Sequence, residues 1–272
     1  EVRCGTDADR DLAAPISIRL GQAVGTYLKK EGRSRITLAC DCRLSSERLA
    51  SEVGRGLQMT GLEVIDIGVV PTPLLYFSLH HFGDVDGGVM ITGSHNPADY
   101  NGLKVSSGKT TIHGEEIQKI GRILEGADLE QGNGGTESRE IEDPYRRMVR
   151  ECIGRLSRPL KVVVDAGNGT ASDLAPRVYR ELGCEVVELF CEMDGSFPNH
   201  HPDPTVAENL EDLVAAVQQD GADLGIAFDG DGDRIGAVDD TGRILWGDEL
   251  MILFSREILA RHPGATIIGE VK

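Results

Sequence analysis

A strand–helix–strand pattern that occurs twice is the feature that most restricts how this chain can fold. Apolar segments of strand length alternate with longer segments of helical periodicity. The first half contains predicted strands at Ile36–Ala39, Glu63–Ile67 and Gly88–Thr92, and predicted helices at Ile16–Lys30 and Ser45–Met59. Strands that are separated by a helix pair in parallel, so the pattern predicts a layered α/β domain.

The second half of the chain repeats this layout. Arg35–Asp41 is echoed by Lys161–Asp165, Thr60–Ile65 by Leu182–Val187, and the strand before Ser94 by the strand Leu224–Phe228 before Asp229. Chance similarity between unrelated strand–helix–strand units is the alternative explanation. We expect a duplication, which gives two similar three-layer α/β domains with mixed, mostly parallel sheets.

A polar, glycine-rich stretch at Gln131–Thr136 suggests where the two domains meet. We therefore predict a first domain at 1–137 and a second at 138–245. A helix at Asp248–Arg261 and a strand at Ala265–Val271 follow. One helix and one strand cannot form a domain, so we expect 246–272 to be the start of a third, truncated unit.

Composition excludes several classes of partner. The formal net charge of −17 argues against nucleic-acid binding, because a polyanion would be repelled by most of the surface. No apolar run is long enough to span a membrane. The six cysteines form no Cys-x-x-Cys pair, so we expect reduced thiols and a cytoplasmic location.

Ser94 lies in a polar loop directly after a predicted buried strand. Gly93 permits a tight turn and close approach of a ligand, and Lys104 returns a cation to the same region. The glycines of a nucleophile elbow are missing, His95 is badly placed as a base for its neighbour, and there is no Gly-Lys-Ser/Thr of a P-loop. The loop suits a serine that carries a phosphoryl group, although a solvated polar turn is the plain alternative.

The loop Asp229-Gly-Asp231-Gly-Asp233-Arg234 follows the corresponding strand of the second unit. Three converging carboxylates would repel one another without a cation, and they offer the hard oxygen ligands that Mg²⁺ prefers. An EF-hand requires Gly and Glu where this loop has Arg234 and Asp240, so that alternative fails. Arg234 could hold a phosphate oxygen beside the metal, or form an ion pair with a neighbour.

Both loops resemble those of a known family. Thr92-Gly-Ser-His-Asn-Pro97 with Asp99–Lys104, and Asp229–Arg234, are similar to the motifs of the α-D-phosphohexomutases. Val70–Leu74 and Asp194–Pro204 resemble the bacterial phosphomannomutase/phosphoglucomutase branch. The resemblance runs along the whole chain.

The resemblance implies the roles of particular residues. Ser94 would carry the phosphoryl group and would bind Mg²⁺ together with Asp229, Asp231 and Asp233. Arg3, His95 and Lys104 stand where the family places groups that assist proton transfer and orient phosphate, and Lys272 matches a lysine near the sugar. Cys4 replaces the glycine of the family's motif around Arg3.

The resemblance also implies a function. The family interconverts hexose 1-phosphate and hexose 6-phosphate through a hexose 1,6-bisphosphate, with mannose or glucose phosphate as the partner in the full-length enzyme. The family's sugar-recognition and phosphate-binding motifs of domains three and four do not occur here. We therefore expect an inactive or weakly active piece of a mutase, and self-association through uncovered faces. A phosphoserine-dependent phosphatase or phosphotransferase, and a non-catalytic metal-binding fragment, remain the alternatives.

Overall fold

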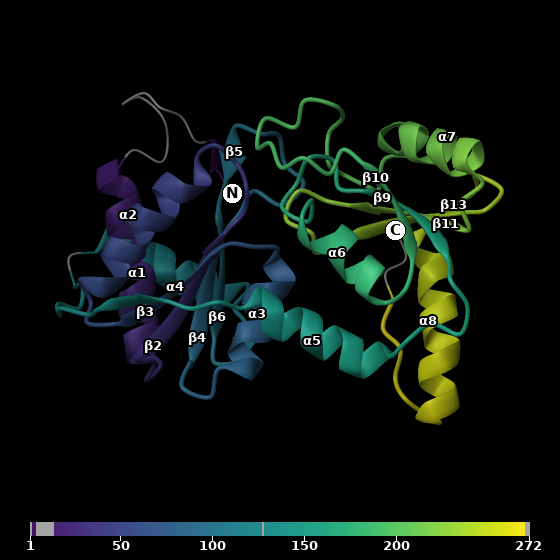
Figure 1. Ribbon diagram of the computed structural model, residues 1–272. Coiled ribbons are helices and arrows are strands. Elements are labelled where there is room, and N and C mark those ends of the chain that lie inside the picture. Colours follow the sequence, from purple (N-terminus) through teal and green to yellow (C-terminus); the bar gives the residue numbers. More distant parts are fainter. Residues whose placement is uncertain (1, 4–13, 127, 270–272) are drawn as a thin grey trace.

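The computed structural model describes residues 2–3, 14–126 and 128–269 of the chain, and it contains two α/β units side by side (Figure 1). The six-stranded sheet of the first unit has the order β7-β6-β4-β2-β3-β8. Its strands are β2 (Arg35–Cys40), β3 (Glu63–Val69), β4 (Gly87–Ile91), β6 (Leu103–Ser107), β7 (Thr110–Thr111) and β8 (Thr136–Ser138). β2, β3, β4 and β8 pair in parallel, while β6 and β7 are antiparallel additions at one edge.

Helices cover both faces of this first sheet. α1 (Ala14–Lys30), α2 (Ser46–Gln58) and α4 (Glu115–Glu125) pack on one face, and α3 (Thr72–His81) packs on the other with α5 (Glu142–Ile153) beside it. α2 places Leu49, Val53 and Leu57 in the core at helical spacing. Side chains of β2 alternate between the two faces of the sheet: Ile36, Leu38 and Cys40 face α1 and α2, while Ala39 faces α3.

The second unit repeats the topology of the first sheet, but its described strands include no counterpart of β8. Its sheet has the order β10-β9-β11-β12-β13, with β9 (Lys161–Asp165), β10 (Glu185–Leu189), β11 (Leu224–Phe228), β12 (Ile235–Asp239) and β13 (Ile244–Leu245). β9 pairs in parallel with β10 and β11, and β12 and β13 are antiparallel, as in the first sheet. α7 (Glu211–Asp220), preceded by the 3₁₀ turn Ala207–Leu210, covers one face, and α6 (Leu174–Glu181) covers the other. The predicted pair of similar three-layer α/β domains is confirmed.

A short two-stranded ladder joins β1 (Val2–Arg3) to β5 (Tyr100–Asn101) beside the loop that contains Ser94. In the part of the chain that the structure describes, no helix is long and apolar enough to cross a membrane.

Two details of the organisation differ from the prediction. β8 extends to Ser138, so the boundary predicted after residue 137 falls inside a strand of the first sheet. α8 (Gly247–Arg261) confirms the last predicted helix, but residues 265–269 are not a strand, and 270–271 lie outside the described residues. A strand needs a neighbour to complete its hydrogen bonds, and no described strand lies alongside this segment.

Candidate active site

Two loops from different units meet where the two sheets present the carboxyl ends of their strands. Ser94 follows β4, and Asp229 follows β11, the equivalent strand of the second sheet. The Ser94 hydroxyl lies 3.4 Å from Oδ2 of Asp229, to which it donates a hydrogen bond. Residues far apart in the sequence therefore form one site, at the edge where α/β sheets commonly bind ligands.

The aspartate loop brings three carboxylates together. One oxygen each of Asp229, Asp231 and Asp233 lies within 4.8 Å of the others, and the first two side chains are buried. The backbone N–H groups of Asp233 and Arg234 both donate to Oδ1 of Asp229 at 3.0 Å. Gly232 has a φ of +71°, which a residue with a side chain rarely adopts, so glycine is required for this turn.

Burial and the neighbouring charges shift the pKa values of Asp229 and Asp231 in opposite directions. Burial, and then the charges of Asp231 and Asp233, raise the pKa of Asp229 to about 7. Burial also opposes ionisation of Asp231, but the Lys104 ammonium 2.6 Å from its Oδ2 holds the pKa of Asp231 below its usual value. Asp229 is therefore partly protonated near neutral pH.

Lys104 is the cation that faces this cluster. Its ammonium lies 2.6 Å from Asp231 Oδ2 and 2.7 Å from Asp233 Oδ2. Burial lowers the pKa of Lys104, but the two carboxylates raise it, with a net result above the ordinary value. With these neighbours Lys104 acts as a fixed positive charge.

The cluster has hard oxygen ligands of the kind that a divalent metal ion prefers. Carboxylate and hydroxyl oxygens are hard ligands, and three carboxylates with the Ser94 hydroxyl supply four of them. Oδ1 of Asp231 is buried and finds no hydrogen-bond partner among the described residues. A buried carboxylate oxygen without a partner is costly unless something satisfies it, and a divalent cation does so. The residues therefore fit a site for a divalent metal ion.

Ser94 itself has an unusual backbone. Its φ is +51°, in the left-handed region that residues other than glycine seldom occupy, and the residue is buried, with 5% exposure. Its N–H donates to Thr92 Oγ1 at 2.8 Å. Strained backbone of this kind is frequent at functional sites.

The remaining predicted residues lie around this centre or outside the description. His95 is half-buried, and its Nδ1 has no hydrogen-bond partner among the described residues. Arg234 is exposed next to the aspartate loop. Arg3 lies in β1, opposite Tyr100, although its side chain is outside the description, and Lys272 lies outside the described residues.

Thr72 is a site residue that the sequence did not reveal. Its hydroxyl donates to Oδ2 of Asp231, and its N–H donates to the Asp231 carbonyl at 2.9 Å. The first turn of α3 in one unit thus fixes the aspartate loop of the other. Thr72 lies in the segment Val70–Leu74, which resembles the bacterial branch of the family, but that resemblance assigned no role to Thr72.

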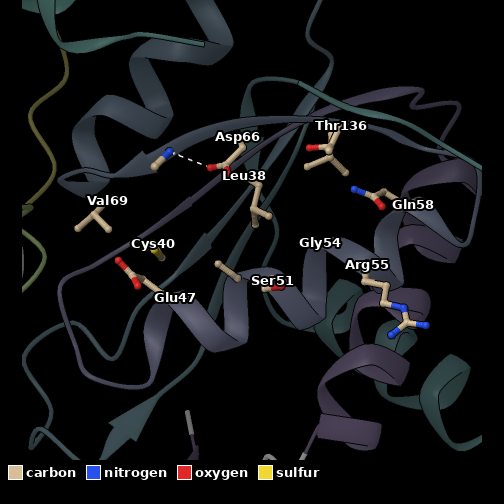
Figure 2. A pocket seen from close by; sticks show the side chains of 13 residues that line it. Leu38, Cys40, Glu47, Ser51, Gly54, Arg55, Gln58, Asp66, Val69 and Thr136 are labelled. Atoms are coloured by element: carbon tan, nitrogen blue, oxygen red, sulfur yellow. Dashed lines mark hydrogen bonds between the residues drawn. The ribbon is translucent and has the colours of Figure 1, made fainter. Parts of the chain in front are cut away.

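A separate hollow of about 630 Å³ lies between α2 and the strands β3 and β8 (Figure 2). Glu47, Arg55 and Asp66 supply its charges, and the Cys40 thiol lies at its wall. Burial, and then the charge of Asp41, raise the pKa of Cys40 to about 12, so the thiol stays protonated and is a poor nucleophile. No predicted site residue lines this hollow, and it is not part of the candidate active site.

Family comparisons agree with this geometry. Residues 3–131 match the alpha/beta/alpha domain I of phosphoglucomutase/phosphomannomutase, and residues 143–242 match domain II of the same family. Phosphomannomutase/phosphoglucomutase of Pseudomonas putida is 46% identical over 97% of this chain and 56% of its own length. Phosphoglucomutase of Neisseria gonorrhoeae is 43% identical over 93% of this chain and 55% of its own length.

A crystal structure of a phosphoglucomutase/phosphomannomutase family protein from Burkholderia thailandensis is similar with a TM-score of 0.89 and 42% identity. The match covers 96% of this chain and 58% of that one. The chain thus spans little more than half the length of the relatives that it matches. Two matched domains, in their order along the chain, and relatives above 40% identity show that this chain belongs to the α-D-phosphohexomutase family.

Proposed function

We propose that this chain supplies the phosphoryl-transfer part of a phosphohexomutase, which interconverts the 1-phosphate and the 6-phosphate of a hexose. The observation that carries the proposal is the buried Ser94 hydroxyl, 3.4 Å from the aspartate cluster that Lys104 faces. The matched relatives are named phosphomannomutases and phosphoglucomutases, which supports mannose or glucose phosphates as the substrate class.

Ser94 would carry a phosphoryl group on Oγ. A sugar hydroxyl would attack the phosphorus, so that the new bond joins sugar oxygen to phosphorus while the Ser94 Oγ–phosphorus bond breaks. The Ser94 Oγ keeps the bonding electrons and takes up a proton, and the product is a hexose 1,6-bisphosphate. The bisphosphate would then turn around, and its other phosphoryl group would pass to Ser94 Oγ by the reverse step. His95, whose Nδ1 is buried without a partner among the described residues, is our candidate acceptor of the hydroxyl proton.

The surrounding residues would stabilise the charge on the transferred group. Lys104 holds a positive charge beside the cluster, and Arg234 is exposed next to it, in a place where it can meet the phosphate of the incoming sugar. Mg²⁺ bound by Asp229, Asp231, Asp233 and Ser94 would neutralise charge on the phosphoryl oxygens. Thr72 would keep Asp231 oriented for that purpose.

The alternative of a phosphatase predicts a different acceptor. A single transfer from labelled Ser94 distinguishes the two functions. The chain, labelled on Ser94 with radioactive phosphate, is mixed with Mg²⁺ and excess glucose 6-phosphate, and the products are separated. The mutase proposal expects label in hexose bisphosphate. Label released as inorganic phosphate at one rate, with or without sugar, would refute it in favour of the phosphatase.

Ser94→Ala is the control for the labelled residue, and it should take up no label. The non-catalytic alternative expects neither uptake nor transfer by the unmodified chain.

A further inference from the structure

We propose that Arg43 is a positioning residue, which holds the backbone of Ser94 in its left-handed conformation and thereby directs the Ser94 hydroxyl at the aspartate cluster. The inference relies on the proposed function only for the role of Ser94 as phosphoryl carrier. It concerns a residue that touches neither the cluster nor the hydroxyl.

Arg43 is fully buried, and every N–H of its guanidinium has an acceptor. Nε donates to Asp41 Oδ2 at 3.1 Å, with both side chains at 0% exposure. The other four N–H groups all donate to backbone carbonyls of the Ser94 loop, namely Pro97 at 2.5 Å, Tyr100 at 3.2 Å, Ser94 at 2.6 Å and Asn96 at 2.7 Å. A guanidinium has five N–H donors in a fixed plane, so one side chain fixes four carbonyls of one loop.

The contact with the Ser94 carbonyl bears on the unusual conformation of that residue. With φ at +51°, Ser94 would relax to a commoner backbone conformation unless its carbonyl were held. The short bond from Arg43 Nη2 holds the carbonyl, while Thr92 accepts the N–H of the same residue. Both sides of the Ser94 backbone are therefore fixed, and the direction of its side chain follows from them.

The aspartate loop touches the same carbonyl. A Cβ on Gly230 would lie 2.6 Å from the Ser94 oxygen and 3.5 Å from Arg43 Nη2. The two loops thus pack at van der Waals distance around the point that Arg43 holds. A movement of the Ser94 carbonyl changes the placement of the hydroxyl relative to Asp229.

The second domain also contacts Arg43. The ring of Phe197 lies over the guanidinium, with 5.1 Å from the guanidinium carbon to the ring centre. The neighbouring Cys42 N–H donates to Thr170 Oγ1 at 3.1 Å, and a Cβ on Gly195 would meet the Cys42 carbonyl at 2.2 Å. Arg43 therefore lies where both domains and both site loops meet.

A double-mutant cycle on Mn²⁺ affinity separates positioning from a general structural role. Mn²⁺ is the probe, and unbound Mn²⁺ is measured by electron paramagnetic resonance for the unmodified chain, Arg43→Lys, Ser94→Ala and the double variant. Lysine keeps the charge but cannot reach four carbonyls. Residues that orient a metal ligand typically contribute about 10- to 100-fold in affinity, so each single change should weaken binding about tenfold or more.

The double variant shows whether Arg43 acts through Ser94. If Arg43 acts through Ser94, the double variant binds Mn²⁺ about as well as Ser94→Ala alone, because the ligand that Arg43 orients is already gone. Losses that simply add, or an unchanged affinity in Arg43→Lys, overturn the proposal. The matched control is Arg139→Lys, which alters an arginine paired with Asp84 and Glu137 away from the site, and should leave the affinity unchanged.

A second measurement keeps the proposal testable without metal. Amide hydrogen exchange of the peptide 93–101 should become faster in Arg43→Lys than in Arg139→Lys, while β2 and β4 stay protected. Equal protection of the loop in both variants counts against the proposal.

A second variant serves if Arg43→Lys does not fold. Phe197→Leu removes the ring over the guanidinium and should weaken Mn²⁺ binding about threefold. Unchanged affinity would then overturn the proposal.

Failure of this proposal and failure of the proposed function can be told apart. A non-additive cycle in a chain whose Ser94 accepts no phosphoryl group would support the role of Arg43 and refute the mutase.

Discussion

Replacing Asp229 by Asn should stabilise the metal-free chain above neutral pH, although it removes a carboxylate from the candidate metal site. Asp229 is fully buried, and burial together with Asp231 and Asp233 raises its pKa to about 7. The unfolded chain ionises this carboxyl near its ordinary pKa of 3.8. Between these values the folded state holds a proton that the unfolded state has lost, so stability falls as pH rises.

The magnitude follows from the interval between the two pKa values. This interval lowers the free energy of unfolding by about 4 kcal/mol; the loss is absent below about pH 4 and complete above about pH 7. An asparagine at this position has no charge, and its oxygen can still accept the N–H groups of Asp233 and Arg234. The variant should therefore avoid most of this loss of stability and keep the hydrogen bonds of the turn.

Urea unfolding of both proteins in EDTA, at about pH 4.5 and about pH 8, measures this difference. We expect little difference at the lower pH and a more stable variant at the higher one. Asp231→Asn is the matched control, with the opposite sign at high pH, because Lys104 stabilises the ionised form of Asp231. Two results would contradict this prediction: an Asp229→Asn variant that is less stable than the unmodified chain at about pH 8, or a difference in free energy of unfolding that is the same at both pH values.

Three further changes have defined outcomes. Ser94→Gly should be about 1 kcal/mol more stable than Ser94→Ala by calorimetry, because only glycine adopts a φ of +51° without strain; equal stabilities would argue against the strain. Lys104→Met should lower the free energy of unfolding by about 3 kcal/mol in EDTA, because it leaves buried Asp231 unpaired, and Mg²⁺ should recover part of the loss. Burial lowers the pKa of His200, but Asp165 raises it above its usual value, so the pair stabilises the chain fully below about pH 6.5 and less as pH rises through the folded pKa. His200→Asn should therefore lose more stability at about pH 6 than at about pH 9 in urea unfolding, and the opposite order would contradict this sign.

Much of the fold could be predicted because the chain repeats a simple pattern. Apolar segments such as Lys161–Asp165 are strands buried on both faces, and their recurrence predicted two sheets of the same topology. β8 was missed because Thr136–Ser138 is exposed and pairs with β3 through its backbone, while the Glu137 side chain forms an ion pair with Arg35, so the segment carries no hydrophobic signal. The strand expected at Ala265–Val271 was wrong over its described part, since an apolar run becomes a strand only beside a partner.

The site was predictable where local sequence determines it. The resemblance of the two loops to the family's motifs implied that Ser94 and Asp229 share one site, and the structure places the Ser94 hydroxyl 3.4 Å from Asp229. Thr72 and Arg43 were missed because their contacts come from the packing of one domain or loop against another. A single arginine in a polar turn is usually a solvated charge, and nothing in the sequence indicated that this one has no exposure.

The proposed role of Ser94 as phosphoryl carrier can be tested directly. The chain is incubated with a hexose 1,6-bisphosphate and Mg²⁺, its intact mass is measured, and the modified peptide is located by fragmentation. We predict one added phosphoryl group on Ser94, absent from Ser94→Ala and retained in Ser106→Ala, which alters another buried serine. An unmodified chain, or a phosphoryl group on a different residue, would contradict it.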